Sequence, residues 1–155
     1  MSVAIRVAVR FLIVVALAAC RADDTDLAAL NCQLDDIPTT IPYAAATPVT
    51  TPPAPELFGE EVLNYHRAEF NEQSLTYQTI RCEMIQYEDD AAAARAFTTA
   101  CNQSIALEGG ASTCSFGEGV ETVAFQRGDI IVLILADLDG MYAHELAGTV
   151  KGRLP

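Results

Sequence analysis

The chain offers few residues with the chemistry of a catalytic site. It contains two histidines, His66 and His144, and one pair of adjacent glutamates, Glu60 and Glu61, that stand out as candidates. A hydrolase needs a nucleophile or a water-activating base beside a second titratable group, and no Gly-x-Ser-x-Gly motif is present. Nothing around either histidine marks it as activated, so we expect both on the surface and predict no catalytic residue. Hydrolysis by the acidic pair or by His66 is the alternative hypothesis.

Two short motifs suggest binding sites but have simpler structural explanations. Residues 137–140 (Asp-Leu-Asp-Gly) begin like a calcium loop, but the sixth and twelfth positions hold Tyr142 and Gly148 instead of glycine and a bidentate acid. The tripeptide at 127–129 (Arg-Gly-Asp) matches an integrin-binding signal, yet Gly-Asp between two apolar segments is typical of a tight hairpin turn. We therefore expect a helix cap and a turn, and neither a metal site nor a cofactor.

The first 19 residues have the composition of an export signal. Arg6 and Arg10 supply positive charge, and residues 11–19 (FLIVVALAA) are apolar but shorter than the about 20 residues that span a bilayer. The sequence Leu17-Ala18-Ala19-Cys20 at its end resembles the lipobox of bacterial lipoproteins. The resemblance implies that the Cys20 thiol receives a lipid and that a signal peptidase cuts before it. It places the protein on the extracytoplasmic side of a cell membrane or outer membrane, anchored by acyl chains such as palmitate.

The remaining cysteines indicate disulfide bonds. With Cys20 assigned to lipid, an exported chain keeps an even number of cysteines, for which three pairings exist. We favour Cys101–Cys114, which would join the end of a helix to the loop that follows it, together with Cys32–Cys82. No Cys-x-x-Cys motif occurs and no histidine lies at ligand spacing from a cysteine, so we do not expect metal or redox chemistry.

The net charge restricts the partners. It is −12 for the whole chain and becomes −14 without residues 1–19, which hold two arginines and no acid. An acidic domain is repelled by the phosphates of nucleic acids and by anionic headgroups. We therefore expect no nucleic-acid partner, and contact with the membrane through the lipid alone, since two or more acyl chains make a stable anchor.

Composition divides the rest of the chain into three parts. Residues 20–36 are acidic, and residues 37–55 hold six prolines among threonines and alanines. Because proline disfavours both helices and central strands, residues 37–55 predict an extended tether. Residues 56–155 should then form the folded domain.

An internal repeat predicts the fold of residues 56–155. The pattern Phe-Gly-Glu-x-Val occurs at 58–62 and at 116–120, and each copy precedes extended segments and then a helical one. The apolar, β-branched run at 130–136 predicts a strand buried on both faces. The pattern predicts an α+β fold, with two ββα units forming a four-stranded, mainly antiparallel sheet and two helices on one face.

Individual elements of the two units follow from local patterns. Residues 75–87 predict a strand with Ile80, Cys82 and Met84 on one face, and residues 62–70 fit neither a strand nor a helix cleanly. Asp89 or Asp90 should cap a helix that ends near residue 103. A second helix should follow Asp139, with an apolar stripe at every fourth residue: Tyr142, Leu146, Val150 and Leu154.

These observations predict how the protein is exported and lipidated, but they do not identify its molecular activity. The first hypothesis is a membrane-tethered, non-enzymatic domain that binds a protein or small ligand. The second is the extracytoplasmic hydrolase described above. The third is an accessory subunit of a complex in the cell envelope.

Overall fold

The computed structural model describes residues 25–38, 40–73, 78–101, 104–106, 112–115, 121–136 and 141–155. Within these ranges, residues 104–106, 112–115, 121, 141 and 142 are described by their backbone only.

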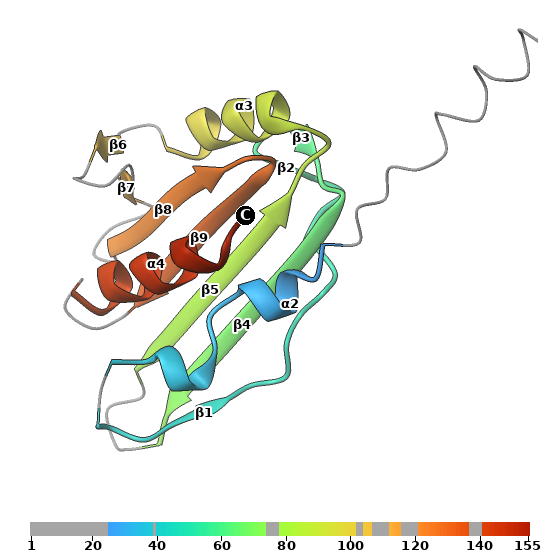
Figure 1. Cartoon of the computed structure of the whole chain (residues 1–155). Helices are drawn as coiled ribbons and strands as arrows, with labels where there is room; N and C mark the ends of the chain where they lie inside the picture. Colours follow the sequence, from blue (N-terminus) through green and yellow to red (C-terminus); the bar gives the residue numbers. More distant parts are fainter. Residues whose placement is uncertain are drawn as a thin grey trace, which may run out of the picture.

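A seven-stranded antiparallel sheet forms the centre of the molecule (Figure 1). Its strands lie in the order β1 (Tyr43–Ala45), β4 (Asn64–Glu72), β5 (Thr79–Gln86), β9 (Ile130–Ala136), β8 (Glu121–Arg127), β7 (Ser112–Ser115) and β6 (Ser104–Ala106). The helices are α2 (Leu27–Leu30), the 3₁₀ turn η1 (Leu34–Asp36), α3 (Asp90–Ala100) and α4 (Met141–Arg153). A small hairpin, β2 (Glu56–Leu57) and β3 (Glu60–Glu61), lies against α3.

The two expected ββα units are present at the centre of this sheet. They are β4-β5-α3 and β8-β9-α4, and strands β5 and β9 of the two units pair with each other. The α+β class is therefore confirmed, but the sheet has seven strands where we predicted four, because short strands extend both edges. Most of residues 62–70, whose secondary structure the sequence left open, belong to strand β4.

Strand β9 is buried on both faces, as its sequence predicts. Ile130, Val132 and Ile134 belong to one core cluster, while Ile131 and Leu133 pack into clusters on the other face. Burying an apolar strand on both faces requires cover on both sides of the sheet. This requirement decides where the helices lie.

The two long helices cover opposite faces of the sheet, so our prediction of two helices on one face is wrong. Helix α4 packs Leu146 and Val150 against the face that carries Cys82 and Met84. Helix α3 packs its alanines against the other face, beside Tyr65, Ile85 and Ile131. A ββα repeat predicts the order of the elements, but the apolar residues on both faces of the central strands demand one helix on each side.

The predicted cap of α3 and the predicted apolar stripe of α4 are confirmed for the residues that the structure describes. Asp89 caps α3, its Oδ1 accepting a hydrogen bond of 2.7 Å from the Ala92 N–H. In α4, the expected stripe residues Leu146, Val150 and Leu154 are buried. The side chain of Tyr142 and the expected cap at Asp139 lie outside the described part of the chain.

Within the segment expected to be a tether, residues 37–55, residues 43–49 lie along the edge of the sheet. Strand β1 pairs with β4, and further along the Val49 N–H donates to the Arg67 carbonyl over 3.0 Å. An edge strand needs donors on one side only, so the prolines that flank β1 are tolerated there. The buried Tyr43 fastens this segment to the core, which begins before residue 30 and not at residue 56.

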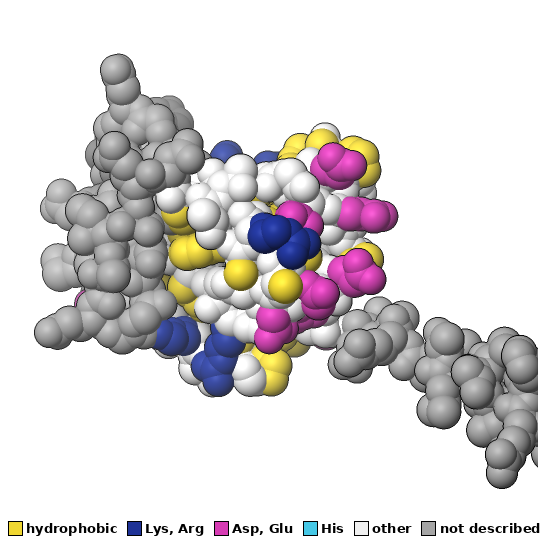
Figure 2. Space-filling view, turned by 90° about the horizontal axis from the view of Figure 1, so that it is seen from above, with side chains coloured by type: hydrophobic (Ala, Val, Ile, Leu, Met, Phe, Trp, Pro, Cys, Tyr) yellow, Lys and Arg dark blue, Asp and Glu magenta, His cyan; other side chains and the backbone are white. Residues whose placement is uncertain are grey.

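The acidic character of the sequence is visible at one end of the molecule. Figure 2 looks onto the end where β4 begins and β5 ends, and acidic side chains gather along one side of the described surface. No helix within the described ranges has the length and apolar character needed to cross a membrane.

Candidate functional site

The N-terminal segment is joined covalently to the centre of the sheet. Cys32, just after α2, forms a disulfide with Cys82 in the middle of β5, with 6.1 Å between the Cα atoms. Both cysteines are almost fully buried, at 2% and 0% exposure. The pairing predicted for these two residues is confirmed. It places α2 on the same face of the sheet as α4.

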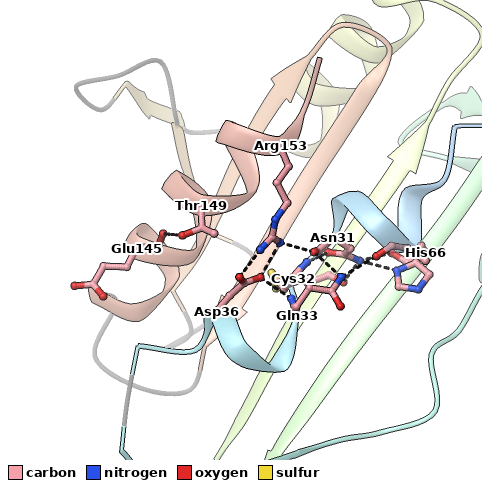
Figure 3. The surroundings of a disulfide bond; sticks show 10 residues. Asn31, Cys32, Gln33, Asp36, His66, Glu145, Thr149 and Arg153 are labelled. Atoms are coloured by element: carbon pink, nitrogen blue, oxygen red, sulfur yellow. Dashed lines mark hydrogen bonds and ion pairs between the residues drawn. A yellow bond between two sulfur atoms is a disulfide. The ribbon is translucent and has the colours of Figure 1, made fainter.

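Asn31 makes the polar contacts beside this disulfide (Figure 3). Its Nδ2 lies 2.8 Å from His66 Nδ1, 3.2 Å from the His66 carbonyl oxygen and 3.1 Å from the Cys82 carbonyl oxygen. Its Oδ1 accepts a hydrogen bond of 2.8 Å from the Cys32 N–H. Asn31 is completely buried, so these contacts replace all of its hydrogen bonds to water.

The contacts of Asn31 determine the tautomer of His66. An amide nitrogen that faces two carbonyl oxygens is a donor, so His66 Nδ1 must accept from it. The ring proton of the neutral imidazole is then on Nε2. Burial lowers the pKa of His66, and the negative charge of Asp26 opposes this shift only in part. His66 is therefore a neutral hydrogen-bond donor through Nε2.

A hollow of about 390 Å³ lies where α2 meets β4. It is lined by Thr25, Asp26, Leu27, Ala28, Thr50, Asn64, Tyr65 and His66. Asp26 caps α2 at this place, its Oδ1 accepting from the Ala28 and Ala29 N–H groups over 3.1 and 3.2 Å. A volume of this size suits a small molecule, and a carboxylate with an imidazole donor suits a polar one. This hollow is the candidate binding site.

Helix α4 also contacts the N-terminal segment beside the site. Arg153 forms a two-point ion pair with Asp36, with 2.7 Å between Nη1 and Oδ2 and a second bond from Nη2 to Oδ1. Arg153 Nη1 also donates to the Asn31 carbonyl over 2.9 Å. Burial would raise the pKa of Asp36, but the hydrogen bonds from Arg153 and from the Gln33 N–H lower it below its ordinary value.

A second hollow of about 560 Å³ is lined by residues of the β2–β3 hairpin and of α3. It contains the acid Glu60, which binds Arg95 through hydrogen bonds of 2.6 and 2.9 Å. The Arg95 hydrogen bond lowers the pKa of Glu60, so this carboxylate is ionised and paired. Glu61 is exposed and, as the next residue in a strand, points to the other side. The two glutamates therefore do not form a carboxylate pair, and the Phe58–Gly59 turn beside them serves to pack Phe58 on α3.

The other candidates from the sequence have structural roles or lie outside the described part of the chain. Gly128 and Asp129 form the two-residue turn between β8 and β9, as expected, with Gly128 at a φ of 60°. His144 is exposed on α4. Cys101 is disulfide-bonded, but the side chain of Cys114 is outside the described residues, so the Cys101–Cys114 pair stays a prediction. Cys20 and residues 137–140 are outside as well. Nowhere in the described ranges do three His, Cys, Asp or Glu side chains gather as metal ligands.

The expectation of a surface position for His66 is wrong, because its side chain is buried among the contacts of Asn31. The sequence indicated Cys32 as a disulfide cysteine but gave no sign of the residues that connect it to His66. Asn31 carried no signal beyond its place beside a cysteine, and it lies 35 positions from His66. Asp36 and Arg153 are 117 positions apart, at nearly opposite ends of the described chain. Only the folding of the N-terminal segment onto the sheet brings these pairs together.

Comparison with known proteins shows a similarity of fold. No protein-family model matches the chain, and no curated protein matches it. The structure is similar to the extracellular domain of PknH from Mycobacterium tuberculosis, with a TM-score of 0.51 and 9% sequence identity. The similarity covers 81% of this chain and 93% of that domain. At this identity it shows that the two chains share a fold.

Proposed function

We propose that this chain is an exported lipoprotein, anchored through Cys20, whose folded part is a non-enzymatic binding or interaction domain on the extracytoplasmic side of the membrane. The observation that carries the proposal is the buried Cys32–Cys82 disulfide, which begins twelve residues after the lipobox cysteine. Disulfides of this kind persist in oxidising compartments and are rare in the cytosol. The fold is also shared with an extracellular domain, that of PknH.

A binding role has more support than hydrolysis. His66 offers a single neutral N–H donor. The ionised carboxylate of Glu60 is paired with Arg95, and the side chain of Glu61 points away from Glu60. His66 and Glu60 line different hollows. The arrangement suits hydrogen bonding to a small polar ligand better than proton transfer or attack on a substrate.

The anchor is tested by replacing Cys20 with serine in the full-length chain. Metabolic labelling with a fatty acid should label the wild-type protein and not the C20S variant, and C20S should be released from the membrane or left uncut. The double variant C32S/C82S is the matched control, because it removes two other cysteines and should keep the label. Normal cleavage and membrane retention of C20S would contradict lipidation.

The remaining alternative, an accessory subunit of an envelope complex, predicts a partner in fixed proportion. Crosslinking of the lipidated protein in its native membrane, followed by purification, separates the two hypotheses. A single stoichiometric membrane-protein partner would favour the accessory subunit. Recovery of the protein without a crosslinked partner would favour a receptor for small ligands. In that case the D26N and H66Q variants should lose binding of the small polar ligand, whereas D35N should keep it.

A further inference from the structure

The place where the chain enters the fold is held at one end of the sheet. Asn64 Nδ2 donates to the Thr25 carbonyl oxygen over 3.1 Å, and Gln86 Nε2 donates to Thr25 Oγ1 over 3.3 Å. Asn64 begins β4 and Gln86 ends β5. The turn between β8 and β9 lies at the same end, because Gln86 Nε2 also donates to Asp129 Oδ2 over 2.9 Å. We call this the entry end of the sheet (Figure 1).

Very little chain separates the entry end from the lipobox cysteine. Thr25 follows Cys20 by five positions. Whatever conformation these residues adopt, five residues span at most about 18 Å. Strand β4 alone, with nine residues, is about 30 Å long. Residues 37–55 follow Thr25 in the sequence, so they add nothing to this connection.

From these lengths we infer that, in the lipid-anchored protein, the entry end faces the headgroup layer of the bilayer and the opposite end, with β1, the end of β4 and the start of β5, faces away. This inference rests on the proposed anchor at Cys20. If the opposite end touched the membrane, Thr25 would lie about 30 Å above it, which is farther than five residues reach. The candidate site, which Thr25 and Asp26 line, would then open beside the headgroups.

The chemistry of the entry end indicates contact without insertion. Leu63 is the one large apolar side chain described as strongly exposed there, at 61%. The exposed acids Asp26, Glu61 and Glu88 lie at this end, and Figure 2 shows acidic side chains along one side of it, with Lys and Arg side chains elsewhere on the same face. Carboxylates are repelled by anionic headgroups, so the lipid and not the protein surface must supply the affinity. A protein without lipid should therefore not bind vesicles.

The absence of tryptophan from the chain allows a direct test of orientation. Leu63→Trp places an indole at the entry end and Ile41→Trp, at a position 38% exposed, places one at the opposite end. Each lipidated full-length protein is reconstituted into vesicles of phosphatidylethanolamine and phosphatidylglycerol that carry a dansyl headgroup lipid. Energy transfer from indole to dansyl should be several-fold stronger for L63W than for I41W. If L63W fails to fold, Glu88→Trp and Gln73→Trp provide a second pair of exposed positions.

Flotation of the same vesicles separates the two proposals. If the proteins float with the vesicles and I41W transfers as much energy as L63W, or more, the orientation is wrong while the anchor stands. If the proteins do not float, the proposed anchor is wrong, and the orientation inferred from it is wrong as well. Strong transfer from L63W in a C20S background would show that the protein surface itself binds lipid, and would overturn the role given to the acids.

Discussion

Asn31 Nδ2 donates a hydrogen bond of 2.8 Å to His66 Nδ1, and this bond joins the N-terminal segment to the second strand of the sheet inside the protein. The next residue, Cys32, makes the disulfide to the strand beside it. A disulfide and a hydrogen bond on neighbouring residues therefore hold the N-terminal segment beside the candidate site, which His66 lines. The hydrogen bond also explains why a histidine at 7% exposure is tolerated in the core.

Replacing Asn31 with leucine should strongly destabilise the protein. The side chain is similar in size, but the His66 and Cys82 carbonyl groups and His66 Nδ1 would lose their donor in a buried place. We expect the free energy of unfolding to fall by about 2–4 kcal/mol, measured by urea denaturation. Gln73→Leu, at an exposed position, should change it by less than about 0.5 kcal/mol. Equal effects of the two substitutions would contradict the role of Asn31.

His66 should make the stability depend on pH on the acidic side of neutrality. Its pKa is lowered in the folded protein from an ordinary value of 6.5, so below pH 6.5 the unfolded chain binds a proton that the folded one does not. The free energy of unfolding should therefore decrease as the pH falls through this range. His66→Gln keeps an acceptor for Asn31 but does not titrate, and the difference between wild type and H66Q should change below about pH 6.5 and be constant above it. A constant difference at all pH values would contradict the shift.

Removing the Cys32–Cys82 disulfide should cost a large part of the stability. The two cysteines are 50 positions apart. Closing a loop of this length contributes about 4 kcal/mol in the chain-entropy model. The C32S/C82S variant should show this loss in urea denaturation without reductant. A loss below about 1 kcal/mol would mean that the noncovalent contacts hold the N-terminal segment by themselves.

The ion pair between Asp36 and Arg153 should stabilise the protein at neutral pH. We expect Asp36→Asn to lower the free energy of unfolding by about 1–2 kcal/mol. Asp35→Asn makes the same charge change at an exposed neighbour and should have less than about 0.5 kcal/mol of effect. Because the pKa of Asp36 is lowered, its contribution is complete above the ordinary value of 3.8 and is lost as the pH falls below it. The wild type and D36N should therefore converge in stability in acid, and a difference that persists there would contradict the ion pair.

Two glycine-to-alanine substitutions should change the free energy of unfolding in opposite directions. Gly128 has a φ of 60° in the β8–β9 turn, where a Cβ is strained even though its nearest neighbour would lie at 3.8 Å. Gly128→Ala should cost about 1–2 kcal/mol. Gly148 lies in α4 with nothing within 4 Å of an added Cβ, so Gly148→Ala should stabilise by about 0.5–1 kcal/mol. Thermal unfolding of both variants tests the pair, and a stabilising G128A would contradict the turn geometry.

Local sequence patterns were enough to predict several elements of the fold. The run at 130–136 predicted a strand buried on both faces, and the spacing of Leu146, Val150 and Leu154 predicted one face of a helix. The acids Asp89 and Asp90 predicted the start of α3, and the even number of cysteines after Cys20 left three possible pairings, of which the favoured one contains Cys32–Cys82. Each of these follows from residues close together in the chain, or from a count of cysteines.

The arrangement of these elements could not be predicted, because it depends on contacts between distant parts of the chain. The prolines in residues 37–55 predicted a tether, yet the free edge of β4 offers donors and acceptors that this segment can pair with. The repeat predicted two similar units but could not say that their helices cover opposite faces, since this depends on which faces of the combined sheet remain apolar. The Asn31–His66 contact likewise requires the N-terminal segment to lie on the sheet. Local pattern encodes the elements, whereas the contacts that build the candidate site arise between elements far apart in sequence.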